Sequence, residues 1–163
     1  MNPTLYNVFD SPIGPITLCS DGVSLTGLYL PQHRHWNGVN PQWHMNESAF
    51  QETKRQLAEY FAGRRKVFDI PLRFQGTPFQ LRVWEALQQI PFGTTISYAD
   101  LASRVGQPNA SRAVGNANGR NPLSIVVPCH RVVGAGGRLT GYAGGVDRKQ
   151  WLLSFESQSV QRS

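Results

Sequence analysis

The patterning of this chain changes at Gln75-Gly76, and no other feature of the sequence constrains the fold as strongly. Before this point, short apolar stretches alternate with turn residues, which is typical of antiparallel strands. After it, apolar residues recur at helical spacing behind helix-capping residues. Strands followed by helices favour a mixed α/β chain of the α+β type. We therefore predict two parts, residues 1–75 and residues 76–163.

The N-terminal part is predicted to form a small antiparallel sheet followed by a helix. Its three apolar stretches, separated by turn residues, are 5–9, 15–19 and 24–30. The polar segment 31–43 is expected to be a loop. Asn46 can then cap a helix. The apolar stripe of that helix is predicted to contain Phe50, Leu57, Tyr60 and Phe61.

The C-terminal part is predicted to be mainly helical. Thr77-Pro78-Phe79-Gln80 combines a capping box with proline at the first helical position. Ser97-Tyr98-Ala99-Asp100 is a second capping box, and its helix ends near Gly106. A further short helix over 111–118 would complete a helix-turn-helix, a pattern that many helical proteins share. The last helix is expected to bury Trp151, Leu152 and Phe155 and to carry Glu156.

The helix predicted over 111–118 consists mostly of small residues. Ser111, Ala113 and Gly115 belong to this set, and Arg112 is its one long cation. Tight packing inside a core would explain the small residues alone. A long arginine on such a helix favours entry into a narrow groove, with one side chain projecting further than the rest.

The positive charge of the chain is concentrated in its second half. The net charge is +6, and residues 76–163 contain nine Lys/Arg against four Asp/Glu. Residues 1–75 are nearly balanced, with seven Lys/Arg against six Asp/Glu. A basic half is expected for a protein with a polyanionic partner such as nucleic acid, although a solvated basic surface explains it equally simply.

A candidate nucleophile lies in Pro128-Cys129-His130-Arg131-Val132. The pentapeptide follows a predicted strand over 124–127 and precedes a glycine-rich stretch over 134–137. The thiolate is the reactive form of cysteine, and a neighbouring imidazole can accept its proton. Cys129 beside His130 therefore indicates covalent chemistry.

The sequence gives little support for a membrane span, secretion, a disulfide or a metal site. No apolar run approaches the roughly 20 residues that a membrane span requires. The N-terminus does not resemble a secretory signal. We therefore expect a soluble intracellular protein, in which a disulfide between Cys19 and Cys129 is disfavoured. Cys19 is predicted to be a small buried apolar residue, and the absence of CxxC or HxxxH motifs argues against a metal site.

The active-site pentapeptide resembles that of the O6-alkylguanine-DNA alkyltransferases, also called methylated-DNA–protein-cysteine methyltransferases. The resemblance is to the bacterial members, and the order and spacing of the motifs match across residues 76–156. Besides the pentapeptide and Ser11-Pro12-Ile13-Gly14-Pro15, the similar segments are Thr77–Gln80, Ser97-Tyr98, Ser111–Gly115, Asn121-Pro122, Tyr142–Gly145 and Lys149–Leu153. The family's fold implies a ribonuclease-H-like N-terminal part and a helical C-terminal part that carries the helix-turn-helix.

The resemblance implies a set of catalytic residues. Cys129 would accept the alkyl group, and His130 would act as a base through a water molecule. Glu156 would orient and polarise His130, and Asn121 would brace the active-site turn. Tyr98 would help to turn the nucleotide out and would donate to the departing base.

The resemblance also implies how DNA is bound. Arg112 would fill the gap that the flipped nucleotide leaves, on a helix whose DNA-binding residues also include Ser111, Ala113 and Gly115. Val132, Tyr142 and Ala143 would bind the substrate base. Double-stranded DNA would be entered through its minor groove, and the family allows clustering of copies along DNA.

The implied reaction is a direct and irreversible transfer from O6-alkylguanine, and by the same chemistry from O4-alkylthymine, to Cys129. Each molecule would react once, as a cytoplasmic monomer without a cofactor. Some members bind zinc in the N-terminal part through two cysteines and two histidines. Only Cys19 lies there, so no metal site is expected.

Two other functions stay open at this stage. Alkyltransferase-like proteins bind lesions without the reactive cysteine, and Cys129 argues against that class. A Cys-His hydrolase would turn over repeatedly, so the stoichiometry of the reaction separates it from a single-use acceptor.

Overall fold

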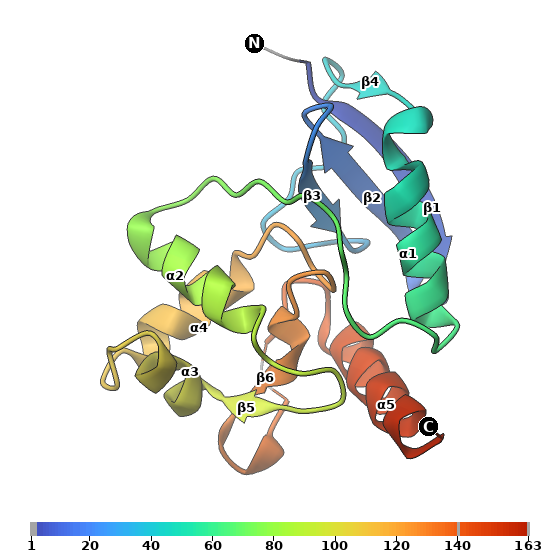
Figure 1. Cartoon of the computed structure of the whole chain (residues 1–163). Coiled ribbons are helices and arrows are strands. Elements are labelled where there is room, and N and C mark those ends of the chain that lie inside the picture. Colours follow the sequence, from blue (N-terminus) through green and yellow to red (C-terminus); the bar gives the residue numbers. More distant parts are fainter. Residues whose placement is uncertain (1–2, 140, 163) are drawn as a thin grey trace.

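The computed structural model describes residues 3–139 and 141–162 and shows two parts (Figure 1). The N-terminal part contains a four-stranded sheet in the order β3-β2-β1-β4. Its strands are β1 (Leu5–Ser11), β2 (Gly14–Ser20), β3 (Leu25–Tyr29) and β4 (His44–Met45). The first three strands pair antiparallel, as predicted, and β4 adds a short parallel pairing to β1.

The turn between β1 and β2 depends on glycine. Gly14 has a φ of +108°, in the left-handed region that side chains rarely adopt. A Cβ at this position would also lie 2.9 Å from the ring of Pro31. This close approach brings the segment that follows β3 against the end of the hairpin.

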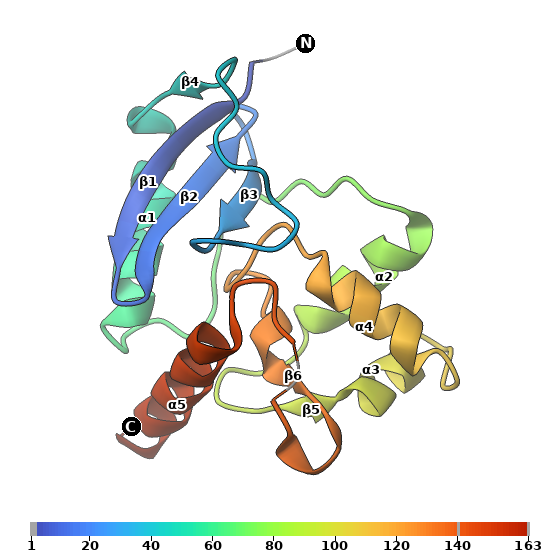
Figure 2. The same cartoon turned by 180° about the vertical axis from the view of Figure 1, so that it is seen from behind.

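A short 3₁₀ turn and a helix follow the sheet. Asn46 accepts a hydrogen bond from the backbone amide of Ala49 (2.8 Å) in the turn η1 (Ser48–Phe50), whose N-cap residue is Glu47. Helix α1 (Gln51–Phe61) continues from it and lies along one face of the sheet (Figures 1 and 2). Phe50, Leu57 and Tyr60 are fully buried, as their spacing predicted.

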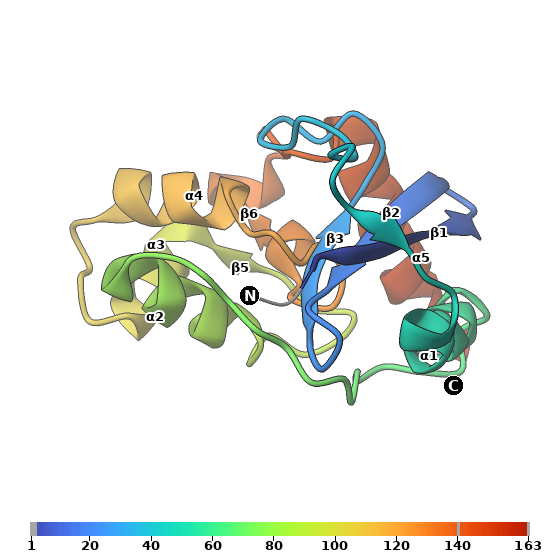
Figure 3. The same cartoon turned by 90° about the horizontal axis from the view of Figure 1, so that it is seen from above.

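The C-terminal part is helical, and α2 (Pro78–Leu87), α3 (Tyr98–Arg104) and α4 (Ser111–Gly119) lie on the side opposite the sheet and α1 (Figure 3). Both predicted capping boxes are present, at Thr77 with Gln80 and at Ser97 with Asp100. Its elements are α2 (Pro78–Leu87), β5 (Ile96–Ser97), α3 (Tyr98–Arg104), α4 (Ser111–Gly119), η2 (Cys129–Arg131), β6 (Val132–Val133), η3 (Ala135–Gly137) and α5 (Val146–Arg162). Helices α3 and α4 form the predicted helix-turn-helix.

The strand predicted over 124–127 is wrong. Leu123 makes a single bridge to Leu28, and the chain then turns instead of extending. The amide of Val127 donates to the carbonyl of Leu123 (2.9 Å), and Ile125 has a φ of +71°. This left-handed residue ends any strand, because β pairing requires a strongly negative φ. The strand of this region comes after the cysteine, as β6, which pairs parallel with β5.

Helix α5 connects the two parts. Trp151 and Phe155 of α5 pack against the ring of Phe61 in α1. Arg148 donates from Nε to the carbonyl of Ile13 in the N-terminal part (2.9 Å). One continuous apolar core therefore extends across both parts. No helix within the described residues is long and apolar enough to cross a bilayer.

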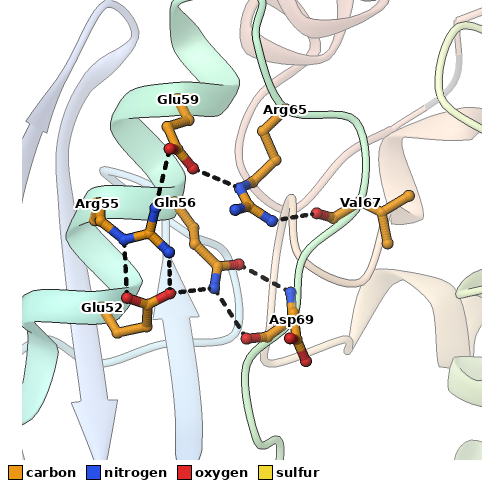
Figure 4. Close-up of polar contacts among 7 residues, drawn as sticks. All are labelled: Glu52, Arg55, Gln56, Glu59, Arg65, Val67 and Asp69. Carbon is orange, nitrogen blue, oxygen red and sulfur yellow. Dashed lines mark hydrogen bonds and ion pairs between the residues drawn. The ribbon is translucent and has the colours of Figure 1, made fainter.

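Polar contacts attach the segment after α1 to that helix (Figure 4). The buried side chain of Gln56 donates to the carbonyl of Asp69 (2.9 Å) and accepts from its amide (2.8 Å). Arg65 pairs with Glu59, whereas Arg55 pairs with Glu52 and Glu59 on the exposed face of the helix. Gln56 thus attaches to α1 the segment that contains Asp69 and links the two parts of the chain, called the linker below.

We expect Gln56→Ala to lower the free energy of unfolding by about 1–2 kcal/mol, because two hydrogen bonds to the linker are lost. Urea unfolding followed by circular dichroism measures this loss. Arg55→Ala is the matched control, since its ion pairs are exposed to solvent, and it should cost clearly less. Equal losses in the two variants would contradict this role of Gln56.

Candidate active site around Cys129

Cys129 begins the 3₁₀ turn η2 and is buried, with 4% of its surface exposed. Burial raises the pKa of the thiol. The neighbouring Asn121 and Tyr142 side chains and the charge of Lys149 act in the opposite direction. Reactivity at neutral pH therefore requires a proton acceptor in addition to these neighbours.

The turn before Cys129 is braced by Asn121. Its side-chain amide donates to the carbonyl of Val127 (2.8 Å), and its oxygen accepts from the amide of Leu123 (3.0 Å). These bonds enclose the left-handed Ile125. A β-branched residue in this conformation is strained and persists only where its surroundings enforce it. The geometry of Asn121 is thus that of a brace for the active-site turn.

The carbonyl oxygen of Cys129 accepts two hydrogen bonds. It accepts from the side-chain amide of Asn118 (3.3 Å) and from the amide of Val132. A carbonyl oxygen has two lone pairs, so these bonds saturate it. The contact of Asn118 ties α4 directly to the segment that carries the thiol.

His130 is fully buried and is held by Glu156. Its Nε2 lies 2.7 Å from Oε2 of Glu156. An ionised carboxylate only accepts hydrogen bonds, so Nε2 must carry the proton. In the neutral ring Nδ1 is then a bare acceptor, and it has no partner among the described residues. His130 is therefore oriented to accept a proton at Nδ1.

Glu156 is surrounded by donors from several elements. Its carboxylate accepts from Nε (2.8 Å) and Nη2 (3.0 Å) of Arg131, from the amide of Gly93 (3.3 Å) and from the hydroxyl of Tyr60 (2.6 Å). Burial alone would raise the pKa of Glu156, but His130 and Arg131 bring it well below its usual range. The carboxylate is therefore ionised at neutral pH.

The imidazole of His130 is poised as a neutral base. Burial lowers its pKa more than the charge of Glu156 raises it. A lowered pKa keeps the ring unprotonated down to a more acidic pH than an exposed histidine. At neutral pH the ring therefore offers a free nitrogen rather than a charge.

Lys149 completes the polar surroundings of the thiol. Its side chain is fully buried, and Nζ has no hydrogen-bond partner in the described part of the chain. The ammonium lies 5.9 Å from the ring centres of both Tyr98 and Tyr142. Burial lowers the pKa of Lys149, whereas the charge of a Cys129 thiolate would raise it. The protonated form of Lys149 therefore favours an anionic sulfur at Cys129.

Tyr98 is brought to this group by the pairing of β5 with β6. It follows Ser97, which pairs with Val133, so the two segments that carry Tyr98 and Cys129 run side by side. A Cβ on Gly115 of α4 would lie 3.6 Å from the ring of Tyr98. Gly115 thus lies against the ring of Tyr98 and is half-buried.

The start of α4 is exposed. Arg112 and Ala113 face solvent and Ser111 is half-buried, whereas Val114 is buried in the core. Trp84 of α2 donates from its indole nitrogen to the carbonyl of Ala117 (2.9 Å) and holds the far end of the helix. Arg112 does not contact the Cys129 cluster through any hydrogen bond or ion pair among the described residues.

The residues predicted to bind the substrate belong to β6 and to the segment before α5. Val132, Tyr142 and Ala143 are buried, and the carbonyl of Ala143 accepts from the amide of Arg34 (2.8 Å). Gly144 is so close to Leu30 that a Cβ would lie 2.5 Å from its side chain. The loop after β3 therefore supports the loop that contains Tyr142 and Ala143.

Three residues of the cluster lay outside the set predicted from the sequence. Tyr60 stood out only as an apolar residue of α1, while Arg131 and Lys149 stood out only as parts of similar motifs. No group of three or more His, Cys, Asp or Glu residues within the described ranges could hold a metal ion. Cys19 is buried, and burial raises its pKa to about 12, so this thiol is unreactive.

Comparisons with known proteins agree along most of the chain. The ribonuclease-like domain of 6-O-methylguanine DNA methyltransferase matches residues 4–74, and the DNA binding domain matches residues 78–158. Methylated-DNA–protein-cysteine methyltransferase from Methanosarcina acetivorans is 50% identical over 151 residues, which cover 93% of this chain and 97% of the relative.

Solved structures give the same result. The crystal structure of Mycobacterium tuberculosis OGT in complex with DNA is 48% identical, with a TM-score of 0.89 over 95% of this chain and 94% of that chain. An O6-methylguanine DNA methyltransferase from Methanococcus jannaschii is 27% identical, with a TM-score of 0.66 over 93% of both chains. The predicted α+β fold, with a ribonuclease-like part and a DNA-binding part, is confirmed.

Replacing Lys149 by a neutral residue of similar length tests its effect on the thiol. We expect Lys149→Met to raise the pKa of Cys129 further and to slow its labelling by iodoacetamide roughly fivefold near pH 7.5. Mass spectrometry follows the labelling, and Lys66→Met, at an exposed position, is the control. Labelling of Lys149→Met at the wild-type rate would show that the ammonium does not act on the sulfur.

Proposed function

We propose that Cys129 is the alkyl acceptor of this chain, which belongs to the 6-O-methylguanine DNA methyltransferase family. The function of the chain is DNA repair by direct alkyl transfer, and its activity is that of a methylated-DNA–protein-cysteine methyltransferase. One observation carries the assignment of the residue. Cys129 adjoins a buried histidine whose Nε2 proton is held by Glu156 and whose Nδ1 is left free to accept a proton.

The reaction begins with removal of the thiol proton. His130 takes this proton at Nδ1 through a water molecule, and the ionised Glu156 stabilises the imidazolium that forms. Lys149 offsets the negative charge on sulfur in a buried site, where electrostatic interactions are strong. Asn121 holds the turn, so that the sulfur stays in position for attack.

The thiolate then displaces the base in line. The C–S bond forms while the bond from the alkyl carbon to O6 breaks, and its electron pair passes to the guanine. Tyr98 donates a proton to the departing base, because guanine leaves readily only when its developing charge is neutralised. The thioether at Cys129 is stable toward its neighbours, so each molecule reacts once.

The target nucleotide must leave the duplex before attack. An O6 substituent is shielded inside the stack, and extrusion costs a few kcal/mol, least for a damaged pair. Helix α4 enters the minor groove with its exposed first turn, where Ser111 and Ala113 are small enough for close approach. Arg112 projects from this turn and fills the gap in the stack.

The extruded base is bound between β6 and the loop after η3. Val132 and Tyr142 line this space, and the backbone near Ala143 donates toward O6. O4-alkylthymine presents a similar exocyclic oxygen and is accepted by the same chemistry. Arg120 is exposed after α4 and either contacts a phosphate of the DNA or faces solvent.

The organisation of the chain follows from this scheme. Residues 1–75 form the ribonuclease-like domain and residues 76–163 the domain that binds DNA and carries the thiol. The limits of the two family matches, 4–74 and 78–158, support this boundary. The protein acts as a monomer in the cytoplasm on double-stranded DNA with alkylated bases, and further copies can cluster along the DNA.

Intact-protein mass spectrometry tests the acceptor directly. After incubation with duplex DNA that contains O6-methylguanine, the protein should gain one methyl group at Cys129 and no more. Cys129→Ala should bind the same DNA and gain no mass, and Cys19→Ala is the matched control that should still react fully. Methyl transfer to Cys129→Ala, or repeated turnover without an adduct, would refute the proposal.

The role of Arg112 is tested by comparing two substrates. We expect Arg112→Ala to slow repair of duplex DNA by about tenfold or more, because extrusion costs a few kcal/mol and the arginine offsets part of it. Transfer from free O6-benzylguanine should change little. Arg104→Ala removes a neighbouring cation at the end of α3 and serves as control. Equal losses on both substrates would exclude a role in base flipping.

A further inference from the structure

Tyr60 is the contribution of the N-terminal part to the cluster around the thiol. It lies in the last turn of α1, is fully buried, and donates from its hydroxyl to Oε2 of Glu156 (2.6 Å). The other donors to this carboxylate, Gly93, His130 and Arg131, all belong to the C-terminal part. The environment of Glu156 is therefore incomplete without α1.

The ring of Tyr60 is fixed on several sides. Its centre lies 5.1–5.9 Å from the centres of four aromatic rings, which belong to Phe61, Phe68, Phe92 and Phe155. Gln56, one turn earlier in α1, attaches the helix to the linker (Figure 4). A side chain packed in this way places its hydroxyl at one point, so the hydrogen bond is directional rather than adaptable.

The hydroxyl of Tyr60 shares an acceptor with His130. Oε2 of Glu156 accepts from Tyr60, from Nε2 of His130 and from Nη2 of Arg131, while Oε1 accepts from Arg131 and Gly93. The bidentate pair with Arg131 fixes the plane of the carboxylate and leaves Oε2 beside the imidazole of His130. Tyr60, the third donor on Oε2, draws off part of the negative charge of the carboxylate.

We propose that Tyr60 is a positioning residue of the transfer reaction: its hydrogen bond to Oε2 fixes the carboxylate of Glu156 and draws off part of its negative charge, so that Nδ1 of His130 stays free to accept the proton of Cys129. This inference rests on the proposed function and deepens it, because it assigns the ribonuclease-like part a role in the chemistry. Tyr60 acts only through Glu156 and His130.

The hydrogen bond has a consequence for proton transfer. The charged and titratable groups that face His130 are Glu156 and Lys149 from α5, Arg131 and Cys129 from η2, and Tyr60 from α1 through Glu156. A donor on Oε2 disperses the negative charge that would otherwise hold a proton on the imidazole. Removal of the hydroxyl therefore raises the pKa of His130.

The test compares Tyr60→Phe with wild type and with Tyr6→Phe, which removes a hydroxyl from the sheet far from the site. The rate constant for methyl transfer from duplex DNA is measured between about pH 5 and pH 9, and the titration of His130 is followed by NMR of its Cε1 proton. We expect Tyr60→Phe to react about tenfold more slowly near neutral pH. Its acid limb and the His130 titration should both move to higher pH, whereas Tyr6→Phe should match wild type.

The outcomes separate the two proposals. A pH profile and His130 titration of Tyr60→Phe that superimpose on wild type would overturn the positioning role, however far its melting temperature falls. Failure of the wild-type protein to form an adduct at Cys129 would instead overturn the proposed function. If Tyr60→Phe does not fold, 3-fluorotyrosine at position 60 replaces it. The more acidic phenol donates more strongly, so the acid limb should move to lower pH, and an unchanged limb would again overturn the role.

Discussion

The buried carboxylate of Glu156 is the interaction on which the site depends. Taking a carboxylate out of water is costly unless its oxygens are paired, and removal of one partner from a buried ion pair is strongly destabilising. Here every lone pair faces a donor, from Tyr60, Gly93, His130 or Arg131. One charge thereby connects α1, the turn before β5, η2 and α5, so the same contacts fold the chain and orient its base.

The thiol of Cys129 and the imidazole of His130 are both neutral in the unmodified protein. Burial raises the pKa of Cys129 and lowers that of His130, so the resting pair is thiol and imidazole rather than thiolate and imidazolium. Such a pair is protected from non-specific oxidation and alkylation, because the thiolate is the reactive form of cysteine. A cysteine that reacts once, as we propose for Cys129, benefits from this protection. The buried charge of Lys149 then favours the anion when the proton is removed.

Local signals in the sequence were sufficient for most of the fold. The capping boxes at Thr77 and Ser97 and the hairpin turn at Gly14 depend on neighbouring residues only, and the structure confirms them. The strand predicted before Cys129 failed because Asn121 and the left-handed Ile125 impose a turn on an apolar run that otherwise suits a strand. The pattern of apolar residues alone does not reveal that a side chain will hold the backbone in a turn through hydrogen bonds.

Only site residues that lie within recognisable sequence motifs could be predicted from the sequence. Cys129 and His130 were named from the chemistry of an adjacent thiol and imidazole, and Glu156, Asn121 and Tyr98 from the family resemblance. The structure brings them together without testing their roles. Tyr60 escaped notice because its partner Glu156 is 96 residues away in the chain. Lys149 escaped notice because a lysine on an amphipathic helix is expected at the surface. Contacts between distant segments are set by the assembled fold, and no local pattern contains them.

The tautomer of His130 is the central claim, because it decides which nitrogen can receive the thiol proton. Two-dimensional ¹H–¹⁵N NMR of the ring at neutral pH measures it directly in the unmodified protein. The account predicts a neutral imidazole with the proton on Nε2 and the chemical shift of a bare acceptor at Nδ1. A proton on Nδ1, or a ring that is already charged at neutral pH, would contradict the account.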